Sequence, residues 1–276
     1  MARVSRLDVE LVRRGLARSR EHAAALIAAG RVEVRGVVAT KAATGVGGDA
    51  SVRVLADDAD PGYVSRGGHK LAGALAAFPA VSVQGRRCLD AGASTGGFTD
   101  VLLRAGAREV VAVDVGYGQL AWSLRTDQRV TVIDRTNVRA LQPETLGGRV
   151  GLTVADLSFI SLPIVLPALT ACTDESGDIL PMVKPQFEVG RERLGAGGVV
   201  RDPMHRAEAV QQVAGVARDL GWPARGVARS PLPGPSGNVE FFLWLQRSDD
   251  AGIGFDEIVR ATTEPDPAGE DDGGAR

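Results

Sequence analysis

Lysine is scarce in this chain: among 32 basic residues only Lys41, Lys70 and Lys184 are lysines, and the rest are arginines. Arginine stays protonated at any working pH, whereas a lysine amine can lose its proton and act as a base. Lys70 and Lys184 lie in polar strings rich in glycine or proline, at 65–70 and 183–188. Retention by chance on a solvated surface is one explanation. Two such lysines on either side of a glycine-rich loop favour a catalytic role.

Other absences exclude whole classes of protein. Two cysteines and three scattered histidines provide neither a disulfide framework nor a zinc cluster, so we expect no metal site. The longest apolar runs are far shorter than a membrane span, which argues against a pore-forming protein and a membrane partner. The N-terminus lacks the apolar stretch of a signal peptide, and we expect a cytoplasmic protein. The hydrophobic content of 44% is enough for a folded core.

The net charge of −2 conceals an asymmetry along the chain. Residues 248–276 contain nine acidic side chains and two arginines, and we expect an acidic tail that is disordered near its end. Residues 1–55 contain ten basic and five acidic side chains. A basic N-terminal segment of this kind suits a nucleic-acid partner.

Helix and strand patterns divide the chain into a small and a large domain. Helices are expected over 7–15 and 19–29, followed by a strand, a glycine turn and a strand over 31–38 and a further strand over 51–55. These elements predict a small α+β domain over 1–59. Residues 60–64, with Pro61-Gly62, read as a linker to a domain over 65–247.

The large domain alternates strands with helices. A helix is expected from Lys70 to about residue 78, with later helices over 98–104, 120–124, 162–169 and 205–220. Strands are expected over 87–90, 109–114, 130–134, 150–156, 178–183 and 239–245. This alternation predicts an α/β, Rossmann-like, mostly parallel sheet with helices on both faces. Ligands bind such sheets at the carboxyl ends of the strands. Ionisable residues follow five of these strands: Asp90, Asp114, Asp134, Asp156 and Lys184.

The loop after the first of these strands predicts a cofactor site. Gly92, Gly96 and Gly97, with Ala93 and Ser94 between them, do not have the spacing of a dinucleotide or phosphate-binding loop. Asp90 before the loop could hold an ammonium group, and Asp114 could accept hydrogen bonds from two ribose hydroxyls, with Asp134 at the next strand end. A ligand with an amino-acid end, a nucleoside and no phosphate fits S-adenosylmethionine. A simple strand-to-helix turn is the alternative.

The remaining polar residues at the strand ends favour methylation of a hydroxyl group. Residues 156–159 lack the proline-rich string typical of methylation at a base nitrogen, and neither cysteine is placed for methylation at a ring carbon. Lys70, Asp156, Lys184 and Glu240 are left. Because an alcohol must lose its proton to become a good nucleophile, we expect Lys184 to act as the base, with Lys70 easing its deprotonation or positioning the hydroxyl. Asp156 and Glu240 would orient the amines and the ribose.

Four other residues have competing interpretations. Glu188 could replace a carboxylate of the catalytic set, although Pro185 makes helical pairing with Lys184 unfavourable. His69 is expected at the surface or at a helix entry. Trp122 and Phe159 could stack on a base, but core packing is the favoured interpretation.

The large domain resembles the FtsJ/RrmJ-type ribose 2′-O-methyltransferases, and nearly the whole chain, to about Leu245, resembles the TlyA family. The first domain resembles its S4 RNA-binding module, at 6–8, 15–20 and 30–32. The second resembles its methyltransferase domain, at 64–71, 90–99, 155–162, 184–188 and 234–240.

The resemblance implies a Lys-Asp-Lys-Glu catalytic set, with ribosomal RNA or ribosomal subunits as the partner. The implied reaction is 2′-O-methylation of cytidine in small-subunit and often large-subunit RNA, which tunes sensitivity to ribosome-targeting antibiotics. Members are also called haemolysins. One departure is the linker, where actinobacterial members have Arg-x-Trp-Val and this chain has Pro61-Gly62-Tyr63-Val64. A non-catalytic RNA-binding protein would have lost the catalytic set, which is complete here.

Positively charged side chains on both domains are candidates for contacts with RNA phosphates, although each alone is equally consistent with a solvated surface. They are Arg6, Arg18, Arg20, Lys41, Arg66, Arg135 and Arg139.

Overall fold

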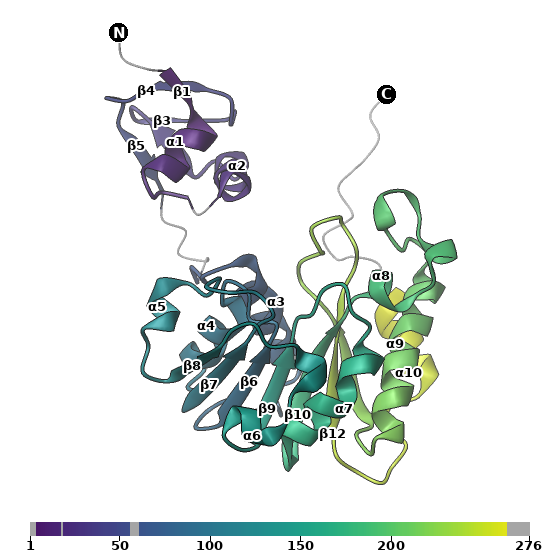
Figure 1. The fold of residues 1–276 in the computed structure, drawn as a ribbon. Helices are drawn as coiled ribbons and strands as arrows, with labels where there is room; N and C mark the ends of the chain where they lie inside the picture. The colour runs from purple at the N-terminus through teal and green to yellow at the C-terminus, as the bar shows by residue number, and fades with distance from the viewer. Residues whose placement is uncertain (1–3, 18, 56–60, 264–276) are drawn as a thin grey trace. The chain divides into compact units, whose positions relative to one another are not determined.

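The chain folds into two compact units, Met1–Gly62 and Tyr63–Arg276 (Figure 1). A computed structural model describes residues 4–17, 19–55 and 61–263. The expected acidic end of the chain therefore lies partly outside the described residues, as do Arg18 and Asp60.

The first unit packs two helices against short strands. Ser19 caps α2 by accepting a hydrogen bond from the His22 backbone N–H, as its position before the helix predicted. Leu7, Leu11, Ile27 and Val32 are buried in a core of the unit's own. Strand β1 pairs with β4, and β2 lies between β3 and β5. The elements are β1 (Val4–Arg6), α1 (Leu7–Arg13), α2 (Arg20–Ala28), β2 (Val32–Val34), β3 (Val37–Val38), β4 (Gly45–Gly47) and β5 (Val52–Val54).

A seven-stranded sheet in the order β11-β12-β10-β9-β6-β7-β8 forms the centre of the second unit. The strands β10, β9, β6, β7 and β8 run parallel, whereas β12 is antiparallel to both β10 and β11. The strands are β6 (Arg87–Ala91), β7 (Glu109–Val113), β8 (Val130–Ile133), β9 (Val150–Ala155), β10 (Thr173–Val183), β11 (Ala224–Arg229) and β12 (Phe241–Gln246). The mostly parallel α/β fold that the sequence predicted is confirmed.

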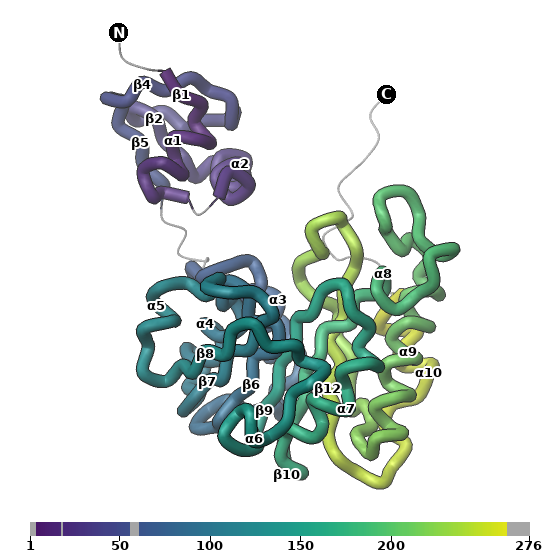
Figure 2. Tube along the Cα trace, in the orientation of Figure 1, coloured from purple at the N-terminus to yellow at the C-terminus, as the bar shows by residue number. Residues whose placement is uncertain are grey.

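Two hydrophobic clusters cover the two faces of this sheet, since successive strand residues point to opposite sides. One cluster involves α3 (Arg66–Ala77), α4 (Gly97–Arg104) and α5 (Trp122–Arg125). The other involves α6 (Pro143–Leu146), α7 (Leu162–Cys172), α9 (Pro203–Asp219) and α10 (Phe255–Thr263). The short α8 (Pro185–Glu188) follows β10 directly, and Figure 2 traces the chain between these layers.

Three expectations differ from the structure. Helix α3 begins at Arg66 rather than at Lys70, and β11 joins the sheet although no strand was predicted there. Part of the expected disordered tail is the helix α10, which buries Ile258 against the sheet-covering layer. Its amphipathic pattern explains the difference, because apolar side chains recur on one face despite the acidic composition.

The last residues of the expected linker also belong to the second unit. The Val64 backbone N–H donates a 2.9 Å hydrogen bond to Asp100 on α4. The Tyr63 ring contacts His69 edge-on and lies 5.0 Å from the Arg104 guanidinium carbon. Tyr63 and Val64 are therefore packed against α3 and α4 at the start of the second unit.

Candidate functional site

The glycine-rich loop after β6 touches the end of β9. Gly92 has φ of +88°, and a Cβ atom there would lie 2.5 Å from the Asp156 carbonyl oxygen. Only glycine combines this conformation with this approach. The Ser94 backbone N–H donates to Asp114 Oδ2 at 2.8 Å, and the Gly116 N–H donates to Oδ1 at 2.7 Å. The loop, Asp114 and Asp156 are therefore positioned together.

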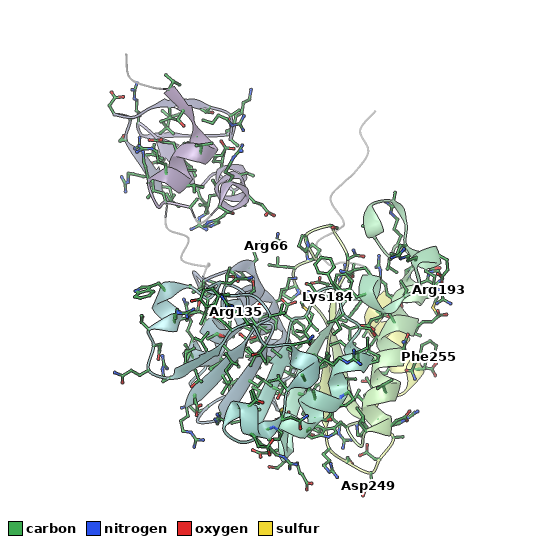
Figure 3. The ribbon with its side chains drawn as sticks, in the orientation of Figure 1. Arg66, Arg135, Lys184, Arg193, Asp249 and Phe255 are labelled. Carbon is green, nitrogen blue, oxygen red and sulfur yellow. The ribbon has the colours of Figure 1, made fainter. Side chains whose placement is uncertain are left out.

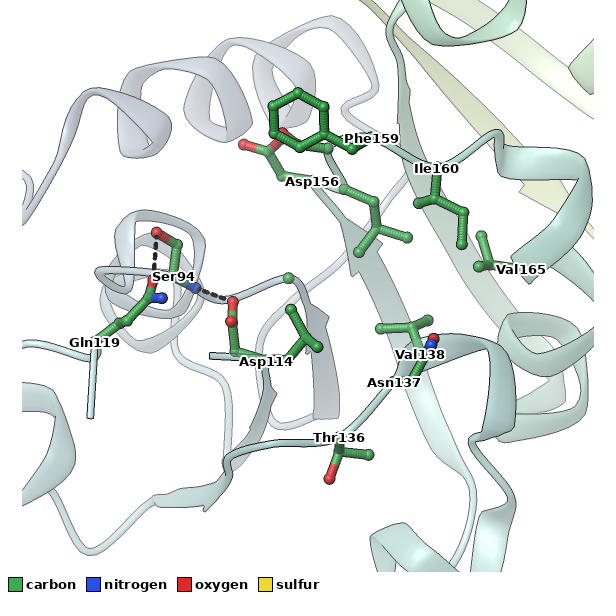
Figure 4. Close-up of a pocket in the computed structure, with 14 residues that line it drawn as sticks. Ser94, Asp114, Gln119, Thr136, Asn137, Val138, Asp156, Phe159, Ile160 and Val165 are labelled. Atoms are coloured by element: carbon green, nitrogen blue, oxygen red, sulfur yellow. Dashed lines mark hydrogen bonds between the residues drawn. The ribbon is translucent and has the colours of Figure 1, made fainter. Parts of the chain in front are cut away.

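A cavity of about 450 Å³ opens at this carboxyl edge of the sheet (Figure 4). Four of the predicted site residues line it: Gly92, Ser94, Asp114 and Asp156. Sequence reasoning missed Gln119, which lies within 3.4 Å of Ser94 Oγ, and the residues that follow β8. The further lining residues are Val115, Gln119, Thr136, Asn137, Val138, Leu157, Ser158, Phe159, Ile160 and Val165.

Asp90 is fully buried beneath the loop. Thr99 donates a 2.6 Å hydrogen bond to Asp90 Oδ2, while Oδ1 has no hydrogen-bond partner among the described residues. Burial, opposed by the Thr99 hydrogen bond and reinforced by the charge of Asp156, raises the pKa of Asp90 to about 7. A carboxylate with an unused buried oxygen suits a cationic group bound against the loop.

The raised pKa makes stability depend on pH. The folded protein binds the Asp90 proton more tightly than the unfolded chain, so its contribution to stability is complete below about pH 4 and is lost as pH rises to about 7. In urea unfolding, the stability of the wild type relative to Asp90→Asn should therefore fall between these pH values and level off above them. A difference independent of pH would contradict the assignment.

Lys184 directly follows β10, at the start of α8, and is buried, with 7% of its surface exposed. Its Nζ lies 2.6 Å from Asp156 Oδ1 in an ion pair and donates a 2.9 Å hydrogen bond to Ser158 Oγ. Asp156 and Ser158 both belong to the segment after β9. The strand ends of β9 and β10 thus bring together an amine, a carboxylate and a hydroxyl.

Lys70 and Glu240 form a second buried pair, with Nζ and Oε2 2.5 Å apart. Lys70 lies within α3, and Glu240 directly precedes β12. Helix α3 can approach the cofactor loop because small residues meet there: a Cβ on Gly97 would lie 2.8 Å from the Gly68 nitrogen. A Cβ at Gly234 would lie 2.6 Å from Glu240 Oε1, so a larger residue there would displace the carboxylate. The four predicted catalytic residues therefore form two ion pairs.

A second cavity, of about 350 Å³, contains Lys184 and Glu240. Ser158 and Phe159 line both cavities and mark their junction. The second cavity is further lined by Gln186, Phe187, Leu194, Gly197, Gly198, Pro235, Ser236 and Asn238. The buried Asn238 accepts a hydrogen bond from Val200 N–H and donates one to the Gly198 carbonyl, and so fixes the glycine-rich wall. The sequence pattern offered no signal for this role.

Phe159 and Trp122 are exposed, at 91% and 77%, so the predicted core packing is wrong for both. Phe159 has φ of +63° in the loop after β9, which turns it away from the core. Its ring centroid lies 5.3 Å from that of Phe187 at the mouth of the second cavity. Apolar residues on loops escape the periodicity by which core positions are recognised.

Two other carboxylates are engaged elsewhere. Glu188 accepts hydrogen bonds from Ser161 Oγ and the Leu162 backbone N–H, and so it holds the start of α7 rather than pairing with Lys184. Asp134 lies 3.2 Å from an Arg125 nitrogen and is not among the described residues that line the cavities. Its assignment to the cofactor stays a prediction.

The predicted RNA contacts lie on both units. In the first, the buried Asp8 holds the exposed Arg6 and Arg20 at 3.0 and 2.9 Å, and Lys41 is exposed. The Arg6 hydrogen bond, with Arg20, lowers the pKa of Asp8 to about 2 despite burial. In the second unit, Arg66, Arg135 and Arg139 are exposed, and Arg135 lies over the Tyr117 ring at 4.3 Å. Figure 3 shows Arg66, Arg135 and Lys184 toward the same edge of the sheet.

Across residues 4–17, 19–55 and 61–263, no cluster of histidine, cysteine and acidic side chains could hold a metal ion. Within the same part of the chain, none of the helices combines the length and the apolar character needed to cross a membrane.

Comparison with known proteins identifies both units. Residues 63–247 match the FtsJ-like methyltransferase family, and residues 5–52 match the S4 domain. The 16S/23S rRNA (cytidine-2′-O)-methyltransferase TlyA of Mycobacterium tuberculosis is 60% identical over 96% of this chain and 99% of its own length. Hemolysin A of Brachyspira hyodysenteriae is 36% identical over 86% of this chain and 97% of its own length.

A solved structure of a hemolysin-named protein from Streptococcus thermophilus aligns with a TM-score of 0.75 and 37% identity, over 95% of each chain. The predicted resemblance is thus confirmed for both domains and over nearly the full length. The chain belongs to the TlyA family of S4-containing, FtsJ-like methyltransferases.

Proposed function

We propose that this protein transfers a methyl group from S-adenosylmethionine to the 2′-hydroxyl of a cytidine in ribosomal RNA, in the small subunit and also in the large. One observation carries the proposal: two adjoining cavities share Ser158 and Phe159, one beside the glycine-rich loop and the other containing Lys184 and Glu240. Such a pair of cavities suits a cofactor and a nucleoside that meet at the junction. We infer the cytidine and the class of RNA from the name of the Mycobacterium relative, a 16S/23S rRNA (cytidine-2′-O)-methyltransferase.

The first cavity fits S-adenosylmethionine in size and chemistry. Its volume of about 450 Å³ lies within the usual range for ligand pockets. The Asp114 oxygens each accept one backbone N–H and retain a further acceptor site for a ribose hydroxyl. The unpartnered Asp90 Oδ1 lies beneath the same loop and would favour an ammonium group. When bound, the cofactor supplies an electrophilic methyl group on a sulfonium.

Lys184 is placed to take the proton of the ribose hydroxyl. Its amine lines the second cavity next to the junction, and Asp156 holds it at 2.6 Å. Proton removal in the transition state makes the hydroxyl oxygen a better nucleophile. Glu240 lines the same cavity and pairs with Lys70, and this pair would orient the ribose. Phe159 and Phe187 offer aromatic surface for the base, on which stacking is favourable.

Ribose-methylation mapping tests the proposal. Ribosomal RNA from cells lacking the protein, incubated with purified protein and labelled cofactor, should gain 2′-O-methylcytidine, located by mass spectrometry and primer extension. The same assay on isolated small subunits and on isolated large subunits shows which of the two RNAs is methylated. Label on a base rather than on ribose, or on no RNA at all, would refute the proposed reaction. A ribosomal substrate also implies a cytoplasmic site of action.

The S4 unit should provide RNA affinity and not chemistry, because it has its own core and an ordered Asp8–arginine cluster. Deleting residues 1–60 should leave cofactor binding measured by calorimetry unchanged and abolish methylation of ribosomal RNA. Affinity of the intact protein for RNA should fall steeply with salt, as phosphate contacts require. If the truncated protein methylated ribosomal subunits at the same rate as the full-length protein, the proposed role of the S4 unit in RNA binding would be wrong.

A further inference from the structure

We infer that Ser158 is a positioning residue for Lys184, which fixes the direction of the lysine lone pair toward the substrate hydroxyl. The inference rests on the proposed role of Lys184 as the base. Ser158 Oγ accepts a 2.9 Å hydrogen bond from Lys184 Nζ, and Ser158 lines both cavities at their junction. No catalytic role follows from its sequence pattern, since serine after a strand is common in loops.

The two contacts of the Lys184 amine differ in kind. Ser158 Oγ accepts a 2.9 Å hydrogen bond from Nζ, whereas Asp156 Oδ1, 2.6 Å away, forms an ion pair and accepts no hydrogen bond among the described residues. A hydrogen bond has a preferred direction, so Ser158 fixes one N–H of the amine and limits rotation about the Cε–Nζ bond. The negative charge of Asp156 attracts the other N–H of a neutral amine, which leaves the lone pair the position that faces away from Asp156.

The surroundings leave this task to Ser158. Among the described residues, the Lys184 amine donates a hydrogen bond to Ser158 and forms an ion pair with Asp156, while Glu240 pairs with Lys70. Glu188 is engaged by Ser161 and Leu162 on α7. Ser158 itself is exposed, so its own hydroxyl hydrogen can be donated to water without cost.

The scarcity of lysine permits a direct test. Side-chain NMR of protein with labelled lysine should give three amine signals, and Lys184→Arg identifies the signal of Lys184. Because the Ser158 hydroxyl contacts the Lys184 amine directly, Ser158→Ala should shift the Lys184 signal and leave the signals of Lys41 and Lys70 in place. Turnover on ribosomal RNA should fall about tenfold at saturating substrate, with KM and cofactor affinity little changed, as expected for a lost hydrogen bond.

Two further variants separate positioning from folding. Ser158→Thr keeps the hydroxyl and should restore both the wild-type position of the Lys184 signal and turnover. Ser161→Ala removes a serine of the same loop that contacts Glu188, and it should not move the Lys184 signal. An unchanged Lys184 signal in folded Ser158→Ala overturns the inference, as does a turnover loss that Ser158→Thr does not rescue. The NMR result does not depend on which residue is the base. A shifted Lys184 signal together with a fully active Lys184→Arg enzyme would refute the proposed role of Lys184 as the base, while the contact between Ser158 and Lys184 would still be supported.

Discussion

Replacing Lys184 by arginine should lower the methylation rate by roughly 10²–10⁴-fold, the usual contribution of general-base catalysis. Arginine retains the positive charge beside Asp156 but cannot give up its proton at any working pH. The rate of the wild type should rise with pH until the amine is deprotonated, and the variant should lack this response. Single-turnover methylation of ribosomal RNA across a pH series measures both effects.

Lys41→Arg is the matched control, because Lys41 is exposed on the S4 unit, where a phosphate contact accepts either cation. It should retain nearly full activity. Cofactor affinity of Lys184→Arg should be close to that of the wild type, since the amine lines the second cavity and not the first. Full activity of Lys184→Arg would show that Lys184 acts through charge alone.

Removing the carboxylate of Glu240 should destabilise the protein by about 3–5 kcal/mol, because it leaves the buried Lys70 ammonium without its partner. Urea unfolding of Glu240→Ala measures the loss. The exposed Arg193–Glu208 pair provides the comparison, and Glu208→Ala should cost no more than about 1 kcal/mol.

A double variant separates stability from catalysis. Lys70→Met with Glu240→Met replaces the buried ion pair with apolar side chains, which is often neutral or stabilising. The double variant should recover most of the stability that Glu240→Ala loses and remain inactive in methylation. Recovery of activity along with stability would show that the pair serves the fold alone.

The sheet and the polar residues at its carboxyl edge could be predicted, because continuous apolar strands and the glycine-rich loop are local patterns. Asp90 lies next to the last residue of β6, and Asp114, Asp156 and Lys184 directly follow their strands, so their positions could be predicted with the strands. The pairing of Lys70 with Glu240 could not be derived in this way. It joins the first helix of the domain to a segment 170 residues later and depends on the order of strands in the sheet.

The errors also have local causes. The start of α3 contains Gly67 and Gly68, which lower helix propensity, so the pattern indicated a later start. The structure uses these glycines to bring α3 against Gly97 and Tyr63, a benefit that only the packed structure shows. Gln119 and Asn137 were missed because they lie on loops, where no periodicity marks a residue that faces a ligand.

The Lys70–Glu240 pair affects how the site forms during synthesis of the chain. A protein is synthesised from its N-terminus, so Lys70 leaves the ribosome with α3 and the cofactor loop. Glu240 lies 170 residues later in the sequence and is synthesised after them. Until β12 is added beside β10, the amine has no counter-charge and the second cavity lacks a wall. If Lys70 and Glu240 act as proposed, a chain cut short after β11 would possess the whole cofactor loop and lack activity. On this proposal, the ability to methylate depends on β12, the last strand of the sheet in chain order.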